Sequence, residues 1–118
     1  MTTNIERIEA GPRMSRAAIH GDTVYLAGHV AGDPSADVAG QTREILAKID
    51  EVLAQAGSDK TLVLFANIWL ADIATFDEMN AVWDAWVAPG QPPARATVEA
   101  KLAGVDYKVE IAVIAARR

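Results

Sequence analysis

The sequence predicts an α+β fold, in which a mixed β-sheet carries two helices packed on one of its faces. Short runs of alternating apolar and polar residues indicate strands, and two longer segments repeat apolar residues every three or four positions, as helices do. These segments follow one another in the order strands, helix, strand, helix, strands, which is typical of a two-layer sandwich. The 118 residues match the length of one compact domain, so we expect residues 1–118 to form a single domain.

The first three predicted strands lie in the N-terminal quarter of the chain. We expect a short strand over residues 5–8, which Gly11-Pro12 ends, and then a hairpin whose two strands cover residues 17–20 and 23–28. Gly21-Asp22 separates these two strands and is a dipeptide typical of tight turns.

Two amphipathic helices are predicted in the middle of the chain. The first covers residues 37–56, where apolar side chains form one stripe and Gln41 falls on the opposite, polar face. Gly57 follows the last residue of the stripe and is expected to end this helix in a left-handed conformation. The second helix begins near Thr75, and Pro89-Gly90 ends it.

The remaining predicted strands are one apolar segment and one pair. Residues 62–70 read LVLFANIWL, a nearly continuous apolar run that suits a central strand covered on both faces. Residues 95–102 and 107–115 alternate and flank the short connection 103–106, so we expect them to form a hairpin with each other.

Composition excludes several classes of function. Hydrophobic residues make up 51% of the chain, and the net charge of −5 argues against nucleic acid as a partner. Cysteine is absent, which excludes disulfides and thiol nucleophiles, and no metal-binding motif surrounds the two histidines, His20 and His29. The longest apolar runs are far too short to span a bilayer, so we expect a cytoplasmic protein without membrane contact.

The predicted C-terminal hairpin contains the residues best suited to chemistry. Alternation places Arg95, Thr97, Glu99 and Lys101 on one polar face, and the expected register places Glu110 diagonally from Arg95. A guanidinium binds a carboxylate through two parallel hydrogen bonds, and a nearby carboxylate can hold or deprotonate a water. Arg95 and Glu110 could therefore share one small site; the alternative is a solvated face with cross-strand ion pairs.

The same residues carry a family resemblance. PARATVE over residues 93–99, followed by VEIAVIA over residues 109–115, resembles the C-terminal signature of the RidA (YjgF) family of enamine/imine deaminases. Further segments look like family positions in the same order and with compatible spacing: Gly11-Pro12 and residues 24–28, 41–43 and 79–83.

The resemblance implies a fold and an activity. It implies a chorismate-mutase-like two-layer α+β sandwich that assembles as a homotrimer, with pockets in the clefts between subunits. It also implies hydrolysis of reactive 2-imino acids such as 2-iminopropanoate, the tautomer of 2-aminoacrylate, to 2-oxo acids and ammonia. Neither a cofactor nor a metal is expected for this reaction.

The resemblance also implies roles for individual residues. Arg95 would bind the substrate carboxylate, and Glu110 would position the attacking water. Gly28 and Thr97 would line the pocket, and Asn80 would support it.

Four positions depart from the family pattern and leave the substrate range open. The usual Gly-Pro-Tyr is Gly-Pro-Arg here, and Ala27, His29 and Ala112 replace a common serine, glutamine and glutamate. Arg13 would add a second cation near an anionic ligand, or it is simply an exposed loop arginine. His29 is a candidate general acid, or a hydrogen-bonded structural histidine.

Two other functions remain open at the level of sequence. A protein with the same scaffold could bind small 2-oxo acids or amino acids through Arg95 without catalysis. Endoribonuclease or translation-inhibitor activity is a label carried by some members of this family, and the acidic charge balance argues against it.

Overall fold

The computed structural model describes residues 4–118, so residues 1–3 of the predicted domain lie outside the described residues. In chain order the elements are β1 (Ile5–Ile8), β2 (Ala17–His20), β3 (Thr23–Leu26), α1 (Val38–Gln55), the 3-10 helix η1 (Lys60–Leu62), β4 (Val63–Leu70), the 3-10 helix η2 (Ile73–Thr75), α2 (Phe76–Trp86), β5 (Ala94–Glu99) and β6 (Val109–Ala116).

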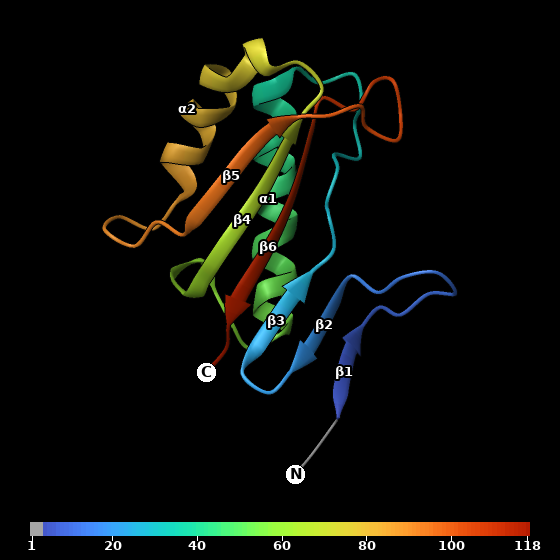
Figure 1. Cartoon of the computed structure of the whole chain (residues 1–118), viewed down its shortest axis with the longest axis vertical. Coiled ribbons are helices and arrows are strands. Elements are labelled where there is room, and N and C mark those ends of the chain that lie inside the picture. The colour runs from blue at the N-terminus through green and yellow to red at the C-terminus, as the bar shows by residue number, and fades with distance from the viewer. Residues whose placement is uncertain (1–3) are drawn as a thin grey trace.

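The described strands form one mixed sheet, and both α-helices pack on the same face of it (Figure 1). The strand order is β1-β2-β3-β6-β4-β5, with β4 and β5 parallel and all other neighbours antiparallel. The predicted fold class, a two-layer α+β sandwich with two helices on one face, is confirmed.

Local signals placed the N-terminal half of the chain correctly. β1 covers the predicted residues 5–8, and the predicted hairpin forms between β2 and β3, with Gly21 at a φ of 61° in its turn. The side chain of Asp37 accepts a hydrogen bond from the Gly40 backbone N–H and caps α1, and Gly57 follows this helix at a φ of 77°.

The core lies between the sheet and the helices. The stripe of α1 and alternate side chains of β4 and β6 are almost fully buried there, and the largest of them are Ile45, Leu46, Ile49, Leu53, Ile68, Leu70, Val109 and Ile111. Each such side chain stabilises the fold by roughly 1.5–3 kcal/mol through removal of apolar surface from water. This packing fixes which face of every strand points toward the helices.

The predicted hairpin between the last two strands is wrong. β4 lies between β5 and β6, so that Ala66 has Arg95 on one side and Val113 on the other. The chain reaches β5 from β4 through α2, a crossover that produces parallel strands. The apolar strand β4 thereby obtains backbone hydrogen bonds along both of its edges, and residues 100–108 pass across its C-terminal end.

Gln41 does not lie on a polar face of α1 as predicted, because its side chain is fully buried. Its amide nitrogen, which has two N–H donors, lies within hydrogen-bond distance of three backbone carbonyls, those of Pro34, Ala36 and Asp106. Its amide oxygen accepts from the backbone N–H of Lys108 at 2.9 Å. Gln41 thus ties the segment before β6 to the start of α1, which fixes where β6 begins.

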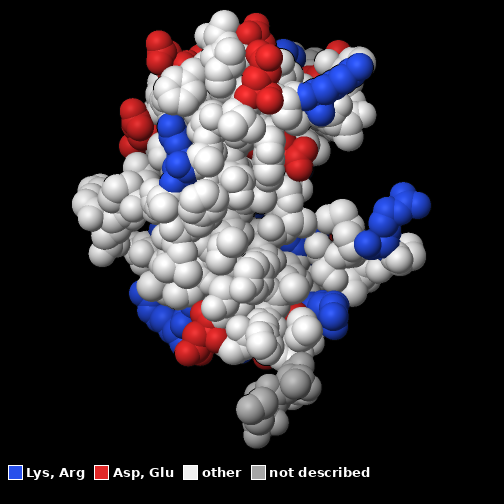
Figure 2. Space-filling model, viewed as in Figure 1, with Lys and Arg blue, Asp and Glu red and all other residues white. Residues whose placement is uncertain are grey.

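The face of the sheet without helices is uncovered and largely apolar. Phe65, Trp69 and Ile114 are half-buried on it, and Tyr25 and Val98 are 49% and 51% exposed. Figures 1 and 2 view the molecule onto the strands with α1 behind them, and uncharged residues cover most of the middle of this face in Figure 2. The prediction that residues 62–70 are covered on both faces is therefore wrong for a single chain.

Candidate functional site

Arg95 lies near the start of β5 and points toward the helices. Its neighbour across the strand pair is Ala66, whose side chain is completely buried on the helix face of β4. Nη1 of Arg95 donates a hydrogen bond of 2.7 Å to Oδ1 of Asn80. The guanidinium carbon lies 5.4 Å from the ring centre of Trp83 and 5.6 Å from that of Phe76. Cation–π attraction and one hydrogen bond thus hold the guanidinium in place.

Helix α2 supplies all three of the residues that hold Arg95. Phe76, Asn80 and Trp83 are spaced four and three positions apart, so they fall on one face of the helix. Sequence analysis selected Asn80 and missed Phe76 and Trp83 as partners of the arginine. The helical spacing of four and three residues from Phe76 to Asn80 and Trp83 could have identified both aromatic residues from the sequence.

Thr97 follows Arg95 by two residues and shares its face of β5. Its hydroxyl oxygen is buried, and within residues 4–118 it is the buried side-chain polar atom that has no hydrogen-bond partner. Leaving a buried hydroxyl unpaired costs about 1–3 kcal/mol. A free N–H fork and a free hydroxyl therefore lie on one strand, at the edge of the sheet.

Glu110 lies on β6 and points to the opposite side of the sheet. Its neighbours Val109 and Ile111 are completely buried against the helices, so the alternation of the strand turns Glu110 toward the helix-free face. Its carboxylate lies against Gly28, where a Cβ atom would collide with it. The absence of a side chain at Gly28 is what allows this close approach.

The structure does not bring Arg95 and Glu110 together within one chain. Arg95 aligns with Ala66 on β4, whereas Glu110 aligns with Trp69, three residues further along the strand. Strand spacing and rise place their Cα atoms roughly 14 Å apart, with the side chains on opposite faces. The predicted diagonal contact is therefore wrong, because β4 occupies the position that the hairpin would have needed.

The cross-strand ion pairs of the alternative interpretation do not form among the described residues. Glu99 does not pair with a neighbouring strand: its carboxylate accepts from the backbone N–H of Ile73 at 3.0 Å. Lys108 donates to the backbone carbonyl of Ala36 at 3.0 Å. The polar face of β5 lies beside α2 and η2, with Arg95 and Thr97 half-buried and Glu99 exposed.

His29 has the contacts of a structural histidine. Nδ1 lies 2.8 Å from the carbonyl oxygen of Ala27, and Nε2 lies 3.4 Å from Nη2 of Arg16. Burial lowers the pKa of His29 below its ordinary value of 6.5, and the positive charges of Arg16 and Lys48 act in the same direction. The ring is thus neutral at pH 7, donating from Nδ1 and accepting at Nε2.

Arg13 lies in the loop between β1 and β2 and lines a cavity of about 530 Å³. The cavity opens over Ala18 and Tyr25, which point to the helix-free face. Arg13 and Glu110 therefore share this face, whereas Arg95, Asn80 and Thr97 belong to the other.

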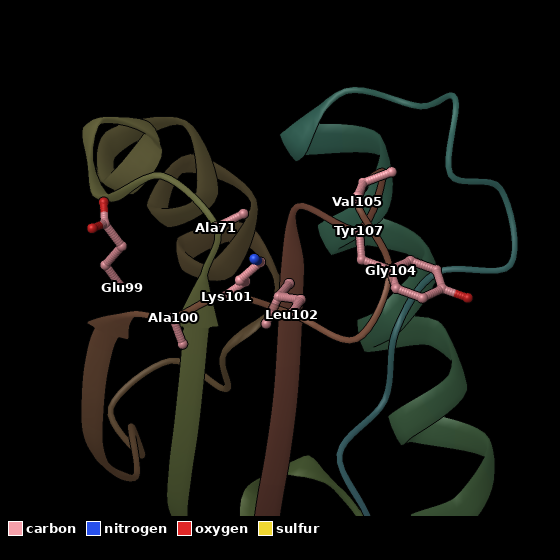
Figure 3. A pocket seen from close by; sticks show the side chains of 8 residues that line it. All are labelled: Ala71, Glu99, Ala100, Lys101, Leu102, Gly104, Val105 and Tyr107. Carbon is pink, nitrogen blue, oxygen red and sulfur yellow. The ribbon is translucent and has the colours of Figure 1, made fainter.

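Another pocket, of about 480 Å³, lies at the far end of the sheet and contains none of the predicted site residues. Figure 3 places Lys101 and Leu102 in its centre, with Glu99 and Tyr107 on opposite sides. No group of three histidine, aspartate or glutamate side chains suited to a metal ion occurs in the described part of the chain. None of the described helices is long and apolar enough to cross a membrane.

The fold belongs to the class of small two-layer α+β sandwiches. Its six-stranded mixed sheet carries two helices on one face, and the β4-α2-β5 crossover leaves the other face open. Within that class, the family model described as Endoribonuclease L-PSP matches residues 4–117 of this chain. The chain belongs to this family, whose members are also named the YjgF or RutC family.

Relatives support this assignment over nearly the whole length of the chain. The chain is 47% identical to the RutC family protein YoaB of Escherichia coli over 112 residues, 95% of this chain and 97% of that protein. A YjgF family protein of Neisseria meningitidis has a crystal structure that superposes with a TM-score of 0.95 at 45% identity, over 98% of this chain and 96% of that chain. An uncharacterized protein of Pseudomonas aeruginosa superposes with a TM-score of 0.95 at 44% identity, over 98% and 100% of the two chains.

Proposed function

We propose that this protein hydrolyses small 2-imino acids to 2-oxo acids and ammonia, in a site formed between copies of the chain. The observation that carries the proposal is the guanidinium of Arg95, held between two aromatic rings and bonded to Asn80 through one nitrogen. Its other N–H donors have no hydrogen-bond partner within residues 4–118. Family membership is compatible with hydrolase activity, and imine hydrolysis is what the resemblance to the RidA family implies.

Arg95 would bind the carboxylate of the substrate. A guanidinium offers two parallel N–H donors that match a carboxylate, and the charge-assisted bonds are stronger than neutral ones. The unpartnered hydroxyl of Thr97 lies on the same strand face and would donate to the same ligand. Asn80 fixes the orientation of the fork and leaves its other N–H donors without a partner within residues 4–118.

Glu110 would position and deprotonate the attacking water. The water oxygen adds to C2 of the protonated imine while Glu110 takes one proton of the water, which forms a neutral carbinolamine. Glu110 then gives this proton to the carbinolamine nitrogen, the C–N bond breaks, and ammonia leaves. The hydroxyl proton passes through Glu110 to the ammonia as the 2-oxo group forms, so the protonated imine and one water give the 2-oxo acid and ammonium, and the step needs neither a cofactor nor a metal.

Combining these two residues requires more than one copy of the chain, because they lie on opposite faces of the sheet. Arg95 lies on β5 at the edge of the sheet, where a second copy can approach it. Glu110 lies on a face with half-buried Phe65 and Trp69 and half-exposed Tyr25, an apolar surface typical of subunit contacts. We propose the homotrimer that the family resemblance implies, with Arg95 and Glu110 contributed by different subunits.

Ribonuclease activity has little support among the residues described. Acid–base cleavage of RNA would need titratable groups close together, yet His20 is exposed on β2 and His29 is buried and hydrogen-bonded. The net charge of −5 also disfavours a polyanionic substrate.

The test is the release of ammonia and 2-oxo acid from imines that an amino-acid oxidase generates in situ. The variant Arg95→Lys keeps the charge but loses the planar fork, and its kcat/KM is expected to fall by roughly 10- to 100-fold. Arg43→Lys on α1 is the matched control and should retain wild-type turnover. Light scattering should give about three times the 12.6 kDa mass of one chain.

Two results would overturn the proposal. One is the absence of imine hydrolysis by the wild-type protein, and if a 2-oxo acid still binds, the protein is a non-catalytic binder instead. The other is wild-type turnover by Arg95→Lys.

A further inference from the structure

The chain that leaves β3 runs beside β6 and is bridged to it at His29 (Figure 1). The backbone N–H of His29 donates to the carbonyl of Ile111 at 2.8 Å, and the N–H of Ile111 donates back at 3.1 Å. Gly28 directly precedes His29, and Glu110 directly precedes Ile111. The bridge therefore holds the backbone of Gly28 beside Glu110, whose carboxylate lies so close that a Cβ atom at Gly28 would collide with it.

The side chain of His29 fastens the other end of this short segment. Its Nδ1 lies 2.8 Å from the carbonyl oxygen of Ala27, so the ring closes a turn around Gly28. The backbone N–H of Ala27 donates to the carbonyl of Arg16 at 2.9 Å. Gly28 itself makes no hydrogen bond within residues 4–118, so its position depends on the residues on either side of it.

Arg16 decides which tautomer the ring adopts. Nη2 of Arg16 lies 3.4 Å from Nε2 of His29, and a guanidinium can only donate hydrogen bonds. Nε2 is therefore unprotonated, and the proton on Nδ1 is donated to Ala27. A second proton, on Nε2, would place two N–H groups against each other and break the contact with Arg16. Only the neutral ring can make both bonds.

The charged groups around the ring oppose this second proton. They are Arg16, which precedes β2, and Lys48 on α1. Arg16 also pairs with Glu9 at 3.1 Å, and Lys48 also pairs with Glu44 at 3.3 Å. Among the described residues, no carboxylate is hydrogen-bonded to the ring. Burial and then the two cations hold the pKa of His29 below its ordinary value of 6.5, and they outweigh the opposite effect of its backbone hydrogen bond.

We propose that His29 is a positioning residue for Glu110: its neutral ring holds Gly28 against the Glu110 carboxylate, and a second proton on the ring releases it and lowers turnover. The inference rests on the proposed function, in which Glu110 takes a proton from the attacking water. Arg95, which would bind the substrate carboxylate, is held by α2 instead. Loss of the neutral ring should therefore lower kcat and leave KM nearly unchanged.

The experiment measures kcat and KM for 2-iminopropanoate, with the amino-acid oxidase that generates it in excess. At about pH 7.5, His29→Ala should lower kcat about tenfold, because the Glu110 carboxylate is displaced but still present. His29→Gln offers one donor and one acceptor in place of the neutral ring, so it should recover most of this loss. His20→Gln replaces an exposed histidine of β2 and is the control, with the kcat of wild type.

The pH dependence of kcat is a readout that a merely structural role would not move. Glu110 must be ionised in wild type and in His29→Gln alike, whereas only wild type has a ring at position 29 that takes up a proton. The ratio of wild-type to His29→Gln kcat should therefore fall as pH is lowered. This fall should centre on the pH at which the His29 ring titrates, which NMR of its Cε1–H follows on the same protein.

The outcomes separate this inference from the proposed function. A kcat of His29→Ala equal to that of wild type overturns the positioning role and leaves imine hydrolysis standing, as does a kcat ratio that stays constant while the ring titrates. If His29→Ala does not fold, the ratio of wild type to His29→Gln still decides.

If wild type hydrolyses no imine, the proposed function fails, and the NMR signal of the Glu110 carboxyl carbon decides on the positioning role. The chemical shift of this carbon should change together with the titration of the His29 ring in wild type, and this change should be absent in His29→Gln. A carboxyl shift that does not follow the ring, or that is the same in both proteins, overturns the inference.

Discussion

Oδ1 of Asn80 accepts a 2.7 Å hydrogen bond from Nη1 of Arg95, and this bond connects helix α2 to the edge strand β5. It orients a guanidinium that also lies between the rings of Phe76 and Trp83. Since the rings hold the cation without fixing its rotation, the hydrogen bond decides which N–H donors face a ligand. Asn80 is thus a positioning residue.

Two replacements of Asn80 should distinguish loss of the hydrogen bond that orients Arg95 from a change of charge beside it. Asn80→Ala removes the acceptor and is expected to raise KM about tenfold with a smaller change in kcat. Asn80→Asp keeps the hydrogen bond but places a carboxylate beside Arg95, where it competes with the carboxylate of the substrate. KM should therefore rise further, although the free energy of unfolding is retained. Steady-state kinetics and thermal unfolding check this, with the exposed Asp84→Ala on the same helix as the control. Equal KM in all three variants would contradict the positioning role.

Thr97→Val should weaken ligand binding without lowering the free energy of unfolding. The variant removes a buried hydroxyl that has no partner, so we expect the free energy of unfolding to stay the same or to rise by up to about 1 kcal/mol. Binding of a 2-oxo acid should weaken severalfold because a hydrogen-bond donor is lost. Thr42→Val is the control, since the Thr42 hydroxyl donates to the Val38 carbonyl at 2.7 Å and its loss should destabilise the fold. Urea unfolding and calorimetry measure both effects, and a destabilised Thr97→Val would show that its hydroxyl is paired.

Gly28→Ala should displace the carboxylate of Glu110 without unfolding the protein. The added methyl group would meet the flexible end of the Glu110 side chain, which can rotate away. We expect turnover to fall at least tenfold while the melting temperature changes little. Gly32→Ala is a matched control, because its methyl group would meet the carboxylate of Glu44 at 2.9 Å, away from the site. Wild-type turnover by Gly28→Ala would argue against Glu110 as the group that acts on water.

Glu110→Gln should bind a 2-oxo acid but lose most of its turnover. An amide can orient a water but cannot take its proton, and general-base catalysis typically contributes roughly 10²–10⁴-fold. Calorimetry and ammonia release measure the two properties on the same sample. If binding is lost together with turnover, Glu110 has a structural role instead.

Mixing two impaired variants tests whether different subunits complete the site. When Arg95→Lys and Glu110→Gln chains are unfolded and refolded together, some sites receive both native residues, and roughly a quarter of wild-type activity should return. Each variant refolded alone is the control. A mixture no more active than the two variants refolded alone would contradict a site shared between chains.

The stability of the protein should depend on His29 below neutral pH. Because the pKa of His29 is lowered in the folded state, the unfolded chain binds a proton more readily. The free energy of unfolding therefore falls as pH drops below the ordinary value of 6.5, and continues to fall until pH reaches the lowered pKa. Urea midpoints between pH 7.5 and 5, at roughly half-unit steps, should show a shallower slope for His29→Gln than for wild type. His20→Gln controls for removal of a histidine, and parallel slopes in wild type and His29→Gln would contradict the lowered pKa.

The sequence predicted the elements well because each depends on neighbours in the chain. The hairpin around Gly21 and the helix ended by Gly57 follow from turn geometry and apolar period, and the structure has both. Gln41 was placed wrongly because two of its hydrogen-bond partners, Asp106 and Lys108, lie more than 60 residues away in the sequence. No period within the helix distinguishes a solvated glutamine from one that is buried and fully bonded.

By itself, the sequence determined which residues share a face of a strand. Alternation correctly placed Arg95 with Thr97, and it turned Glu110 away from Val109 and Ile111, because the two-residue period is a local property of the backbone. Only the tertiary structure decided which strands are neighbours. The apolar strand β4 took the place between β5 and β6, where both its edges are hydrogen-bonded and one face is buried against the helices. That choice put Arg95 and Glu110 on opposite sides of the sheet, since strand pairing depends on burying the whole core and not on any single segment.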